Sequence, residues 1–308
     1  MSAKAIHRNT FALRQFDLQA YLEAGTVLVN RALDSFLPRA STKPRTIHQA
    51  MRYSLFAGGK RMRPMLCLAA AEACGGKLAE ALPLACAVEC IHTYSLIHDD
   101  LPAMDNDDFR RGKPTNHKVF GEAMAILAGD GLLTQAFEIA AQCRGWERYP
   151  IRQIILELAY AAGSLQLLAG QVADLEAEGQ KLSPRQLQYI HERKTSALLC
   201  CCVRLGGMSA NCSKAQLQAL TEFGYNVGLA FQIIDDILDV TQTSEQLGKT
   251  AGKDTAAQKA TYPSIVGLEK SRDIARDLTN KAFAALKIFR GKAQALEGLA
   301  DYLLRRDK

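Results

Sequence analysis

Two aspartate-rich segments are the residues of this chain best suited to chemistry. They are Asp99-Asp100-Leu-Pro-Ala-Met-Asp105 and Asp235-Asp236-Ile-Leu-Asp239, and each directly follows an apolar helical run. Carboxylates crowded so closely repel one another and are costly to desolvate, so they call for a cation. Oxygen ligands indicate Mg²⁺ or Ca²⁺, and magnesium commonly combines a few carboxylates with substrate phosphates. Two such clusters facing each other therefore predict a diphosphate site.

Basic and polar groups accompany both clusters. Arg110 and Arg111 follow the first cluster, and because adjacent arginines point in different directions they could hold two different phosphates. Upstream, Gly58-Gly59-Lys60-Arg61-Met-Arg63-Pro64 places three cations behind two glycines at a helix start, which suits an anion cradle. Further polar groups lie near or beyond the second cluster: Lys194, Thr195, Gln232 and Lys249. Each of these signals is weak alone, because such residues are usually solvated.

The bulk composition is that of a globular protein. The chain has 308 residues, of which 48% are hydrophobic and 23% charged, with a net charge of +6 and a pI near 8.8. Its basic residues are dispersed without aromatic interleaving, which argues against nucleic-acid binding. No stretch reaches the roughly 18 to 20 uninterrupted apolar residues of a membrane helix, so we expect no integral membrane segment.

Residues 1–16 and the cysteines indicate the cellular compartment of the protein. The first 14 residues carry basic groups and no acid but lack the apolar core of a signal peptide, so we expect a flexible arm over 1–16, with a transit peptide as the alternative. The nine cysteines form no CxxC pair and are expected to be reduced, buried thiols, which favours a cytoplasmic location.

Apolar spacing of three and four residues predicts an all-α protein, with residues 17–308 forming one large helical bundle. Gly and Pro punctuation limits the expected elements. We expect helices over 17–35, 46–57, 63–73, 79–100, 119–141, 152–175, 184–205, 214–240 and 262–289, with a last helix ending near Leu304. Both aspartate clusters then lie at the C-terminal ends of helices, where the helix dipole is unfavourable unless cations are bound. Pro102 ends the first of these helices, so Asp105 should turn back beside Asp99.

Four motifs together resemble a known family. GGKRMRP, HTYSLIHDDLPAMDNDDFRRGKPT, HERKTSAL and FQIIDDILDV occur in the order found in the trans-isoprenyl diphosphate synthases, also called polyprenyl synthetases, and the resemblance runs from about residue 20 to the C-terminus. The two-residue insertion in the first motif is similar to that of bacterial farnesyl diphosphate synthases. The resemblance implies the isoprenoid synthase fold, with helices around a deep central cavity, and a homodimer.

The resemblance also implies roles for individual residues. Asp99, Asp105 and Asp235 would hold three magnesium ions on an allylic diphosphate, supported by Asp100 and Asp239, with Asp236 behind them. The same diphosphate would be held by Arg110, Lys194, Lys249 and Lys259. Isopentenyl diphosphate would be bound by Gly59, Lys60, Arg63, His92 and Arg111. Thr195 and Gln232 would stabilise the allylic cation, and 248–253 would form a closing flap.

Product length should depend on what blocks the apolar tunnel beneath the first motif. Tyr94, with Ser95 beside it, lies five residues before Asp99, about 7.5 Å along a helix. In the family an aromatic residue there stops elongation at fifteen carbons. Condensation of isopentenyl diphosphate with dimethylallyl and geranyl diphosphate to farnesyl diphosphate is therefore expected; if Tyr94 only packs in the core, geranylgeranyl diphosphate is the alternative. His98 is expected to pack or to hydrogen-bond within its helix.

Three other classes fit less of the sequence. A terpene cyclase would not need GGKRMRP and Arg111 for a second diphosphate. A non-catalytic synthase subunit is expected to lack one aspartate motif, and both are intact here. A calcium-binding helical protein would leave the arginines unexplained.

Overall fold

Helices dominate the computed structural model, which describes residues 16–241 and 260–305. The longer helices are α1 (Leu18–Phe36), α2 (Arg45–Leu55), α3 (Met62–Ala73), α4 (Leu78–Asp99), α6 (Glu122–Ala140), α7 (Ile151–Ala162), α8 (Leu167–Glu176), α9 (Pro184–His191), α10 (Ala197–Ser209), α11 (Lys214–Thr241), α15 (Leu268–Ala285) and α16 (Gln294–Leu304). The short elements are α5 (Asn116–Phe120), η1 (Glu192–Ser196), α14 (Tyr262–Val266), η2 (Leu286–Phe289), and the strands β1 (Phe109–Arg110) and β2 (Lys113–Pro114).

The all-α prediction is confirmed, and the differences lie inside the longest predicted helices. The predicted helices over 119–141 and 262–289 are divided at Gly121 and Gly267, whose φ angles of 84° and 87° do not fit a right-handed helix. The one over 152–175 is interrupted between α7 and α8. The one over 184–205 holds a π-helical turn, η1. The two-residue strands were not predicted, because so short a pair has no alternating pattern.

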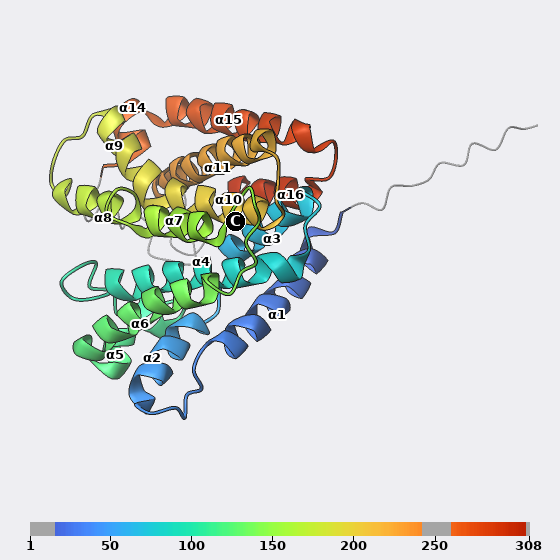
Figure 1. Ribbon diagram of the computed structural model, residues 1–308. Helices are drawn as coiled ribbons and strands as arrows, with labels where there is room; N and C mark the ends of the chain where they lie inside the picture. The colour runs from blue at the N-terminus through green and yellow to red at the C-terminus, as the bar shows by residue number, and fades with distance from the viewer. Residues whose placement is uncertain (1–15, 242–259, 306–308) are drawn as a thin grey trace, which may run out of the picture.

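The helices pack in a continuous series across the molecule. In space α6 lies on α4, α4 on α3, α3 on α10, α10 on α11 and α11 on α15 (Figure 1). Helix α16 packs against α3 and α11, and α8 against η1. The helices that end in the aspartate clusters, α4 and α11, are therefore separated by α3 and α10.

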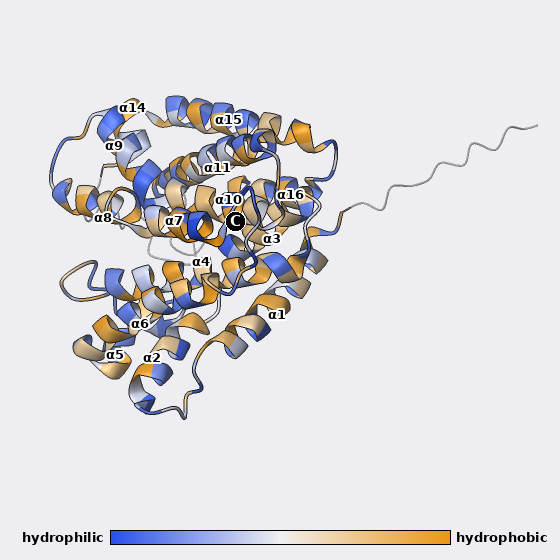
Figure 2. Cartoon of the chain, in the orientation of Figure 1, coloured by the Kyte–Doolittle hydropathy of each residue, from blue (hydrophilic) through white to orange (hydrophobic). Residues whose placement is uncertain are grey.

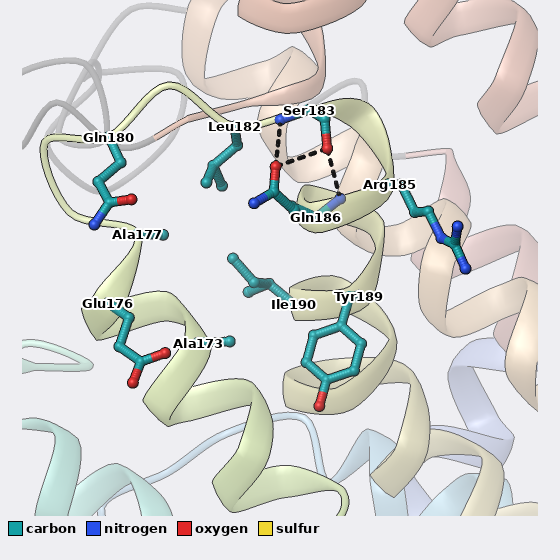
Figure 3. Close-up of a pocket in the computed structure, with 10 residues that line it drawn as sticks. All are labelled: Ala173, Glu176, Ala177, Gln180, Leu182, Ser183, Arg185, Gln186, Tyr189 and Ile190. Atoms are coloured by element: carbon teal, nitrogen blue, oxygen red, sulfur yellow. Dashed lines mark hydrogen bonds between the residues drawn. The ribbon is translucent and has the colours of Figure 1, made fainter.

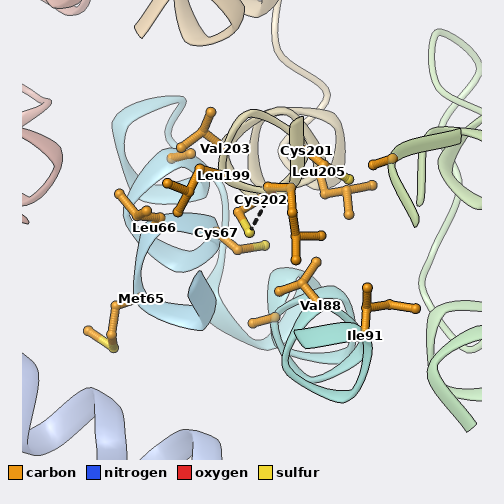
Figure 4. Close-up of a cluster of buried hydrophobic side chains, with 14 of the residues drawn as sticks. Met65, Leu66, Cys67, Val88, Ile91, Leu199, Cys201, Cys202, Val203 and Leu205 are labelled. Atoms are coloured by element: carbon orange, nitrogen blue, oxygen red, sulfur yellow. Dashed lines mark hydrogen bonds between the residues drawn. The ribbon is translucent and has the colours of Figure 1, made fainter. Parts of the chain in front are cut away.

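The centre of the core is the junction of α3, α4 and α10. Val88, Ile91 and Leu205 are buried there near the thiols of Cys67 and Cys202 (Figure 4). At Gly206 a Cβ atom would overlap the carbonyl oxygen of Cys67, so glycine is required for α10 to lie this close to α3. All nine cysteines are free, and seven are buried, which confirms the prediction of thiols that act as small apolar residues.

Two predictions concern the ends of the chain and its most apolar helices. The predicted N-terminal arm, 1–16, lies outside the described residues except for Phe16, whose ring packs 5.3 Å from that of Tyr21. By length and composition alone, two described segments, Glu122–Ala140 and Ile151–Glu176, could cross a membrane. This is weak evidence for a membrane segment, because α6 packs against α2 and α4 and the other segment is broken between α7 and α8.

Candidate active site

The first aspartate cluster forms where α4 ends and the chain turns back. Asp99 is the last residue of α4, and the N–H of Asp105 donates to its carbonyl oxygen at 2.8 Å, as the proline at position 102 predicts. The amide of Gln171 donates to the Asp99 carboxylate. Burial raises the pKa of Asp99 to about 6, an effect that the nearby Lys194 opposes. This carboxylate therefore lies in an environment that favours a cationic ligand.

Asp100 is held by Arg110. The Arg110 Nε atom donates to the two carboxylate oxygens at 2.8 and 2.9 Å, and Nη2 donates at 2.5 Å. Asp100 is 3% exposed. Burial alone would lower the pKa of Arg110, but the hydrogen bond and charge of Asp100 raise it. The arginine predicted to hold the allylic diphosphate thus lies at the predicted site, with its guanidinium paired to the aspartate motif.

The second cluster lies in the last two turns of α11. Asp235 is half-buried, and Asp239 is buried with one carboxylate oxygen, Oδ2, that has no hydrogen-bond partner among the described residues. Asp236 accepts a hydrogen bond from the N–H of Tyr262 at 2.9 Å, and its Oδ2 lies 3.8 Å from the Nε2 of His191. Asp236 therefore anchors the start of α14, which agrees with its predicted place behind the other two.

Helix α8 and the π-turn η1 connect the two clusters. Lys194 of η1 donates to Asp174 of α8 at 2.7 Å, and Thr195 donates to Gln232 of α11 at 3.0 Å. Gln232 lies one helical turn before Asp235. The structure therefore brings Lys194, Thr195 and Gln232 together as the motifs predicted.

Gln171 and Asp174 were missed at the sequence level. Apart from Glu176, its last residue, helix α8 has no other polar side chain. Gln171 and Asp174 are three residues apart, so they share one face of this helix. A polar pair at this spacing in an otherwise apolar helix was the available signal.

A second group of cations surrounds His92, about two turns before Asp99 on α4. Arg111 donates to the carbonyl oxygen of Gly58, and a Cβ atom on Gly59 would lie 2.6 Å from its guanidinium. Arg63 Nη1 lies 3.3 Å from the Nε2 of His92. Burial, followed by the charges of Arg63 and Arg111, holds the pKa of His92 well below its ordinary value, so the imidazole is neutral. Four of the predicted isopentenyl-binding residues thus gather in one place.

Lys60 and Arg61 differ from their neighbours. Lys60 is exposed, and its ammonium lies 4.8 Å from the ring centroid of Tyr302 in α16. Arg61, counted above as a cation of the anion cradle, is 3% exposed and pairs with Glu89 at 2.8 Å. It also donates to Asn30 and to the carbonyl oxygen of Leu55. The assignment of Arg61 to an anion site was wrong, because its guanidinium is buried and already bound to Glu89, Asn30 and Leu55.

The residues predicted to control chain length lie on α4. Tyr94 is 4% exposed, and its ring meets that of His98 edge to face at 5.8 Å between centroids. The ring contact agrees with the predicted packing of His98, whereas its Nε2 lies 3.0 Å from the carbonyl oxygen of Ile126 in α6 and not of a residue in its own helix. Ser95 donates to the carbonyl oxygen of His92 at 3.0 Å. Tyr94 is thus a fixed, buried ring one to two turns below the first cluster.

Some of the predicted site lies elsewhere or is not described. Lys249, Lys259 and the flap 248–253 lie outside the described residues. Within 16–241 and 260–305, no three His, Cys, Asp or Glu side chains come close enough to hold a metal ion by themselves. A pocket of about 700 Å³ lies between α8 and α9, and polar side chains such as Glu176, Arg185 and Gln186 line it together with apolar ones such as Leu182 and Ile190 (Figure 3). It contains none of the predicted site residues.

The donor set suits magnesium shared with a ligand. The clusters supply carboxylates only, one of them with an oxygen that is buried and has no partner in the described part of the chain. Hard oxygen donors at the ends of two helices fit divalent ions that complete their coordination with water and phosphate oxygens. The residues present therefore fit Mg²⁺, with Asp99, Asp105, Asp235 and Asp239 as the candidate ligands.

Fold and site together define an all-helical protein with a candidate divalent-cation site and a separate, candidate anion site lined by arginines. The chain belongs to the polyprenyl synthetase family, because the model of that family matches residues 44–293. It is 52% identical to the heterodimeric geranylgeranyl pyrophosphate synthase large subunit 1 of Arabidopsis thaliana, over 94% of this chain and 79% of that protein.

Two further relatives extend the comparison. Identity to a geranylgeranyl pyrophosphate synthase of Catharanthus roseus is 51%, over 95% of this chain and 82% of that one. The crystal structure of a putative farnesyl-diphosphate synthase from Marinomonas sp. MED121 is similar with a TM-score of 0.81 at 37% identity, covering 94% of this chain and 99% of that one. The chain is thus a trans-prenyltransferase that elongates prenyl chains, and these relatives differ in product length.

Proposed function

We propose that the protein condenses isopentenyl diphosphate head to tail with dimethylallyl diphosphate and then with geranyl diphosphate, and that it stops at farnesyl diphosphate. The observation that carries this proposal is the buried ring of Tyr94, fixed beneath the first aspartate cluster by His98. The names of the two plant relatives favour geranylgeranyl diphosphate as the alternative product.

The allylic diphosphate would lie between the two aspartate clusters. Three magnesium ions, held by Asp99, Asp105 and Asp235, would supply the positive charge that the departing diphosphate needs. Lys194, kept in place by Asp174, would donate to the same anion, where negative charge develops in the transition state. Thr195 and Gln232 would turn their oxygens towards the allylic cation that forms.

Isopentenyl diphosphate would lie beside the glycine turn, against Arg63 and Arg111. Neutral His92 can donate one hydrogen bond to a phosphate oxygen without adding charge. The double bond attacks the allylic carbon, a carbon–carbon bond forms, and the departed diphosphate accepts the proton that is lost. This step requires no side-chain base, and the motifs contain none in an evident position.

The test is to incubate the purified protein with Mg²⁺, isopentenyl diphosphate and dimethylallyl diphosphate, then to dephosphorylate the products and determine their masses. Farnesol as the main alcohol supports the proposal. Geranylgeraniol as the main alcohol leaves chain elongation intact and overturns the fifteen-carbon stop. Folded protein that forms no condensation product would overturn the synthase assignment and favour a cyclase or a non-catalytic subunit.

We propose in addition that two copies of the chain pair through α6, α7 and α8, and that the dimer works in the reducing cytoplasm. Figure 2 shows hydrophobic residues on the outer side of α5, α6 and α8. The exposed large apolar side chains on these elements, on α7 and in the turn before α8 include Val119, Ile126, Leu127, Leu156, Tyr160, Leu165, Leu168 and Val172. So many on neighbouring helices favour a protein partner. Sedimentation velocity tests this: a dimer that Leu156→Glu converts to monomer supports it, and a monomeric parent protein contradicts it.

A further inference from the structure

The π-turn η1 is held by contacts that the chemistry itself does not use. We propose that Arg193, Gln166 and Gly170 are positioning residues that set the conformation of η1, so that Lys194 and Thr195 reach the allylic diphosphate. This inference rests on the proposed function, since it concerns the same site. Single π-turns inside α-helices are often found at functional sites.

The backbone of η1 lies between two glycines. A Cβ atom on Gly170 of α8 would lie 2.6 Å from the Cα of Lys194 and would overlap its nitrogen. A Cβ atom on Gly228 of α11 would lie 2.5 Å from the Cα of Ser196. Since side chains at either position would push the turn away, helices α8 and α11 together fix where its backbone runs.

The side chains of η1 divide between two faces. Lys194 and Thr195 point towards Asp174 and Gln232, on the side of the aspartate clusters. Glu192 and Arg193 line a separate cavity of about 290 Å³ that contains neither Lys194 nor Thr195 in its lining. The turn thus has one face that meets the substrate and one face by which it is anchored.

The anchored face carries specific hydrogen bonds. Arg193 Nη1 donates to Gln166 at 2.8 Å, and its guanidinium lies 5.2 Å from the ring centroid of Tyr189. Glu192 accepts from Gln188 at 2.6 Å and from Tyr225. Gln166 is 9% exposed and lies at the start of α8, four residues before Gly170. Arg193 and Gln166 therefore tie the turn to the same helix that Gly170 brings against it.

Loss of this tie should affect chemistry more than binding of isopentenyl diphosphate. The proposed isopentenyl site lies on α4 and the glycine turn. Within the described part of the chain, the hydrogen bonds of Arg63, His92 and Arg111 go to groups outside η1. A displacement of about 1 Å in a catalytic group can reduce the rate about 100-fold. Removal of the Arg193 anchor is expected to lower the single-turnover rate with geranyl diphosphate by about 10- to 100-fold and to leave KM for isopentenyl diphosphate unchanged.

The chain offers a matched control in the same cavity. Arg204 pairs with Glu157 at 2.5 Å and donates to Thr221 at 2.6 Å, but it belongs to α10 and makes no hydrogen bond to η1. We would compare Arg193→Met with Arg204→Met by single-turnover rate, KM and thermal midpoint. Arg193→Met should lose rate, whereas Arg204→Met should lower the thermal midpoint and keep the rate.

Two further variants separate positioning from folding. Gln166→Glu keeps an acceptor for Arg193 and should retain the parent rate, whereas Gln166→Leu should lose as much rate as Arg193→Met. The double variant with Arg193→Met should be no slower than either single one, because both changes remove the same tie. An unchanged rate in Arg193→Met, or an equal loss in Arg204→Met, overturns the inference while the proposed function stands. A parent protein without condensation activity overturns both.

Discussion

Replacement of Tyr94 by alanine should lengthen the product of this enzyme. Tyr94 is 4% exposed and lies on α4 five residues before Asp99, so under the proposed function its ring would close the space that a growing chain enters. Removing the ring opens that space. One more isoprene unit adds five carbons, and at about 0.8 kcal/mol for each carbon removed from water its burial gains about 4 kcal/mol.

That gain is large enough to change the main product. A difference of about 1.4 kcal/mol is a factor of ten, so 4 kcal/mol is a preference of several hundredfold, and it still exceeds about fiftyfold if a third of it is lost to imperfect packing. The same substitution should lower the free energy of unfolding by about 3 to 5 kcal/mol, because it leaves a cavity where an aromatic ring was packed. Product analysis must therefore be done well below the thermal midpoint.

The assay is the mass of the dephosphorylated alcohols from the parent and from Tyr94→Ala. Tyr149→Ala serves as the control, since Tyr149 is equally buried, at 3%, but lies between α6 and α7. The control should lose stability and keep the parent product. If folded Tyr94→Ala still makes the parent product, Tyr94 is not the stop, and the fifteen-carbon assignment loses its main support.

Three further predictions follow from single contacts. Gly59→Ala should raise KM for isopentenyl diphosphate about tenfold more than Gly58→Ala does. Both glycines have positive φ, but only a Cβ atom at position 59 would meet the guanidinium of Arg111. Equal KM values for the two variants in steady-state kinetics would show that this contact is unimportant. Arg61→Met should cost about 3 to 5 kcal/mol in denaturant unfolding, since it leaves Glu89 buried without its partner, whereas a loss below 1 kcal/mol would contradict a structural role. Burial lowers the pKa of His191 to about 3 from an ordinary value near 6.5, so between these pH values the unfolded state binds a proton that the folded state does not. The free energy of unfolding should therefore fall as pH drops below about 6.5, by about 2 kcal/mol at pH 5. His191→Phe should flatten this dependence in urea unfolding curves.

The sequence predicted the helices and the two aspartate clusters well because both depend on local signals. Apolar spacing identifies a helix, and proline at position 102 ends α4 where the chain must turn. Breaks at Gly121 and Gly267 were missed, since glycine inside an apolar run does not reveal whether its φ will be positive. The π-turn was missed for a related reason: it depends on how closely Gly170 and Gly228 let other helices approach.

Roles of individual charges were harder to predict. Arg61 and Arg63 are two residues apart in the same basic motif, yet Arg61 faces the core and meets Glu89, while Arg63 meets His92. The sequence places both near a helix start but does not show that Glu89, 28 positions away, lies opposite Arg61. Long-range pairing of this kind depends on tertiary packing, so motif spacing alone overestimates the number of cations available to a ligand.

Some charged groups are bound within the protein and others are available to a ligand. This distinction also explains how carboxylates can lie at the C-terminal ends of two helices, where the helix dipole is unfavourable. In each cluster the second aspartate is bound within the protein: Asp100 by Arg110, and Asp236 by the backbone N–H of Tyr262. Those contacts offset the negative end of the helix dipole for one carboxylate of each pair. Asp99 keeps a raised pKa, and Asp239 keeps a buried oxygen without a partner in the described part of the chain. Each motif thus joins one aspartate that secures the local fold to another whose environment favours a cation, and under the proposed function a cation shared with a diphosphate would satisfy both clusters together.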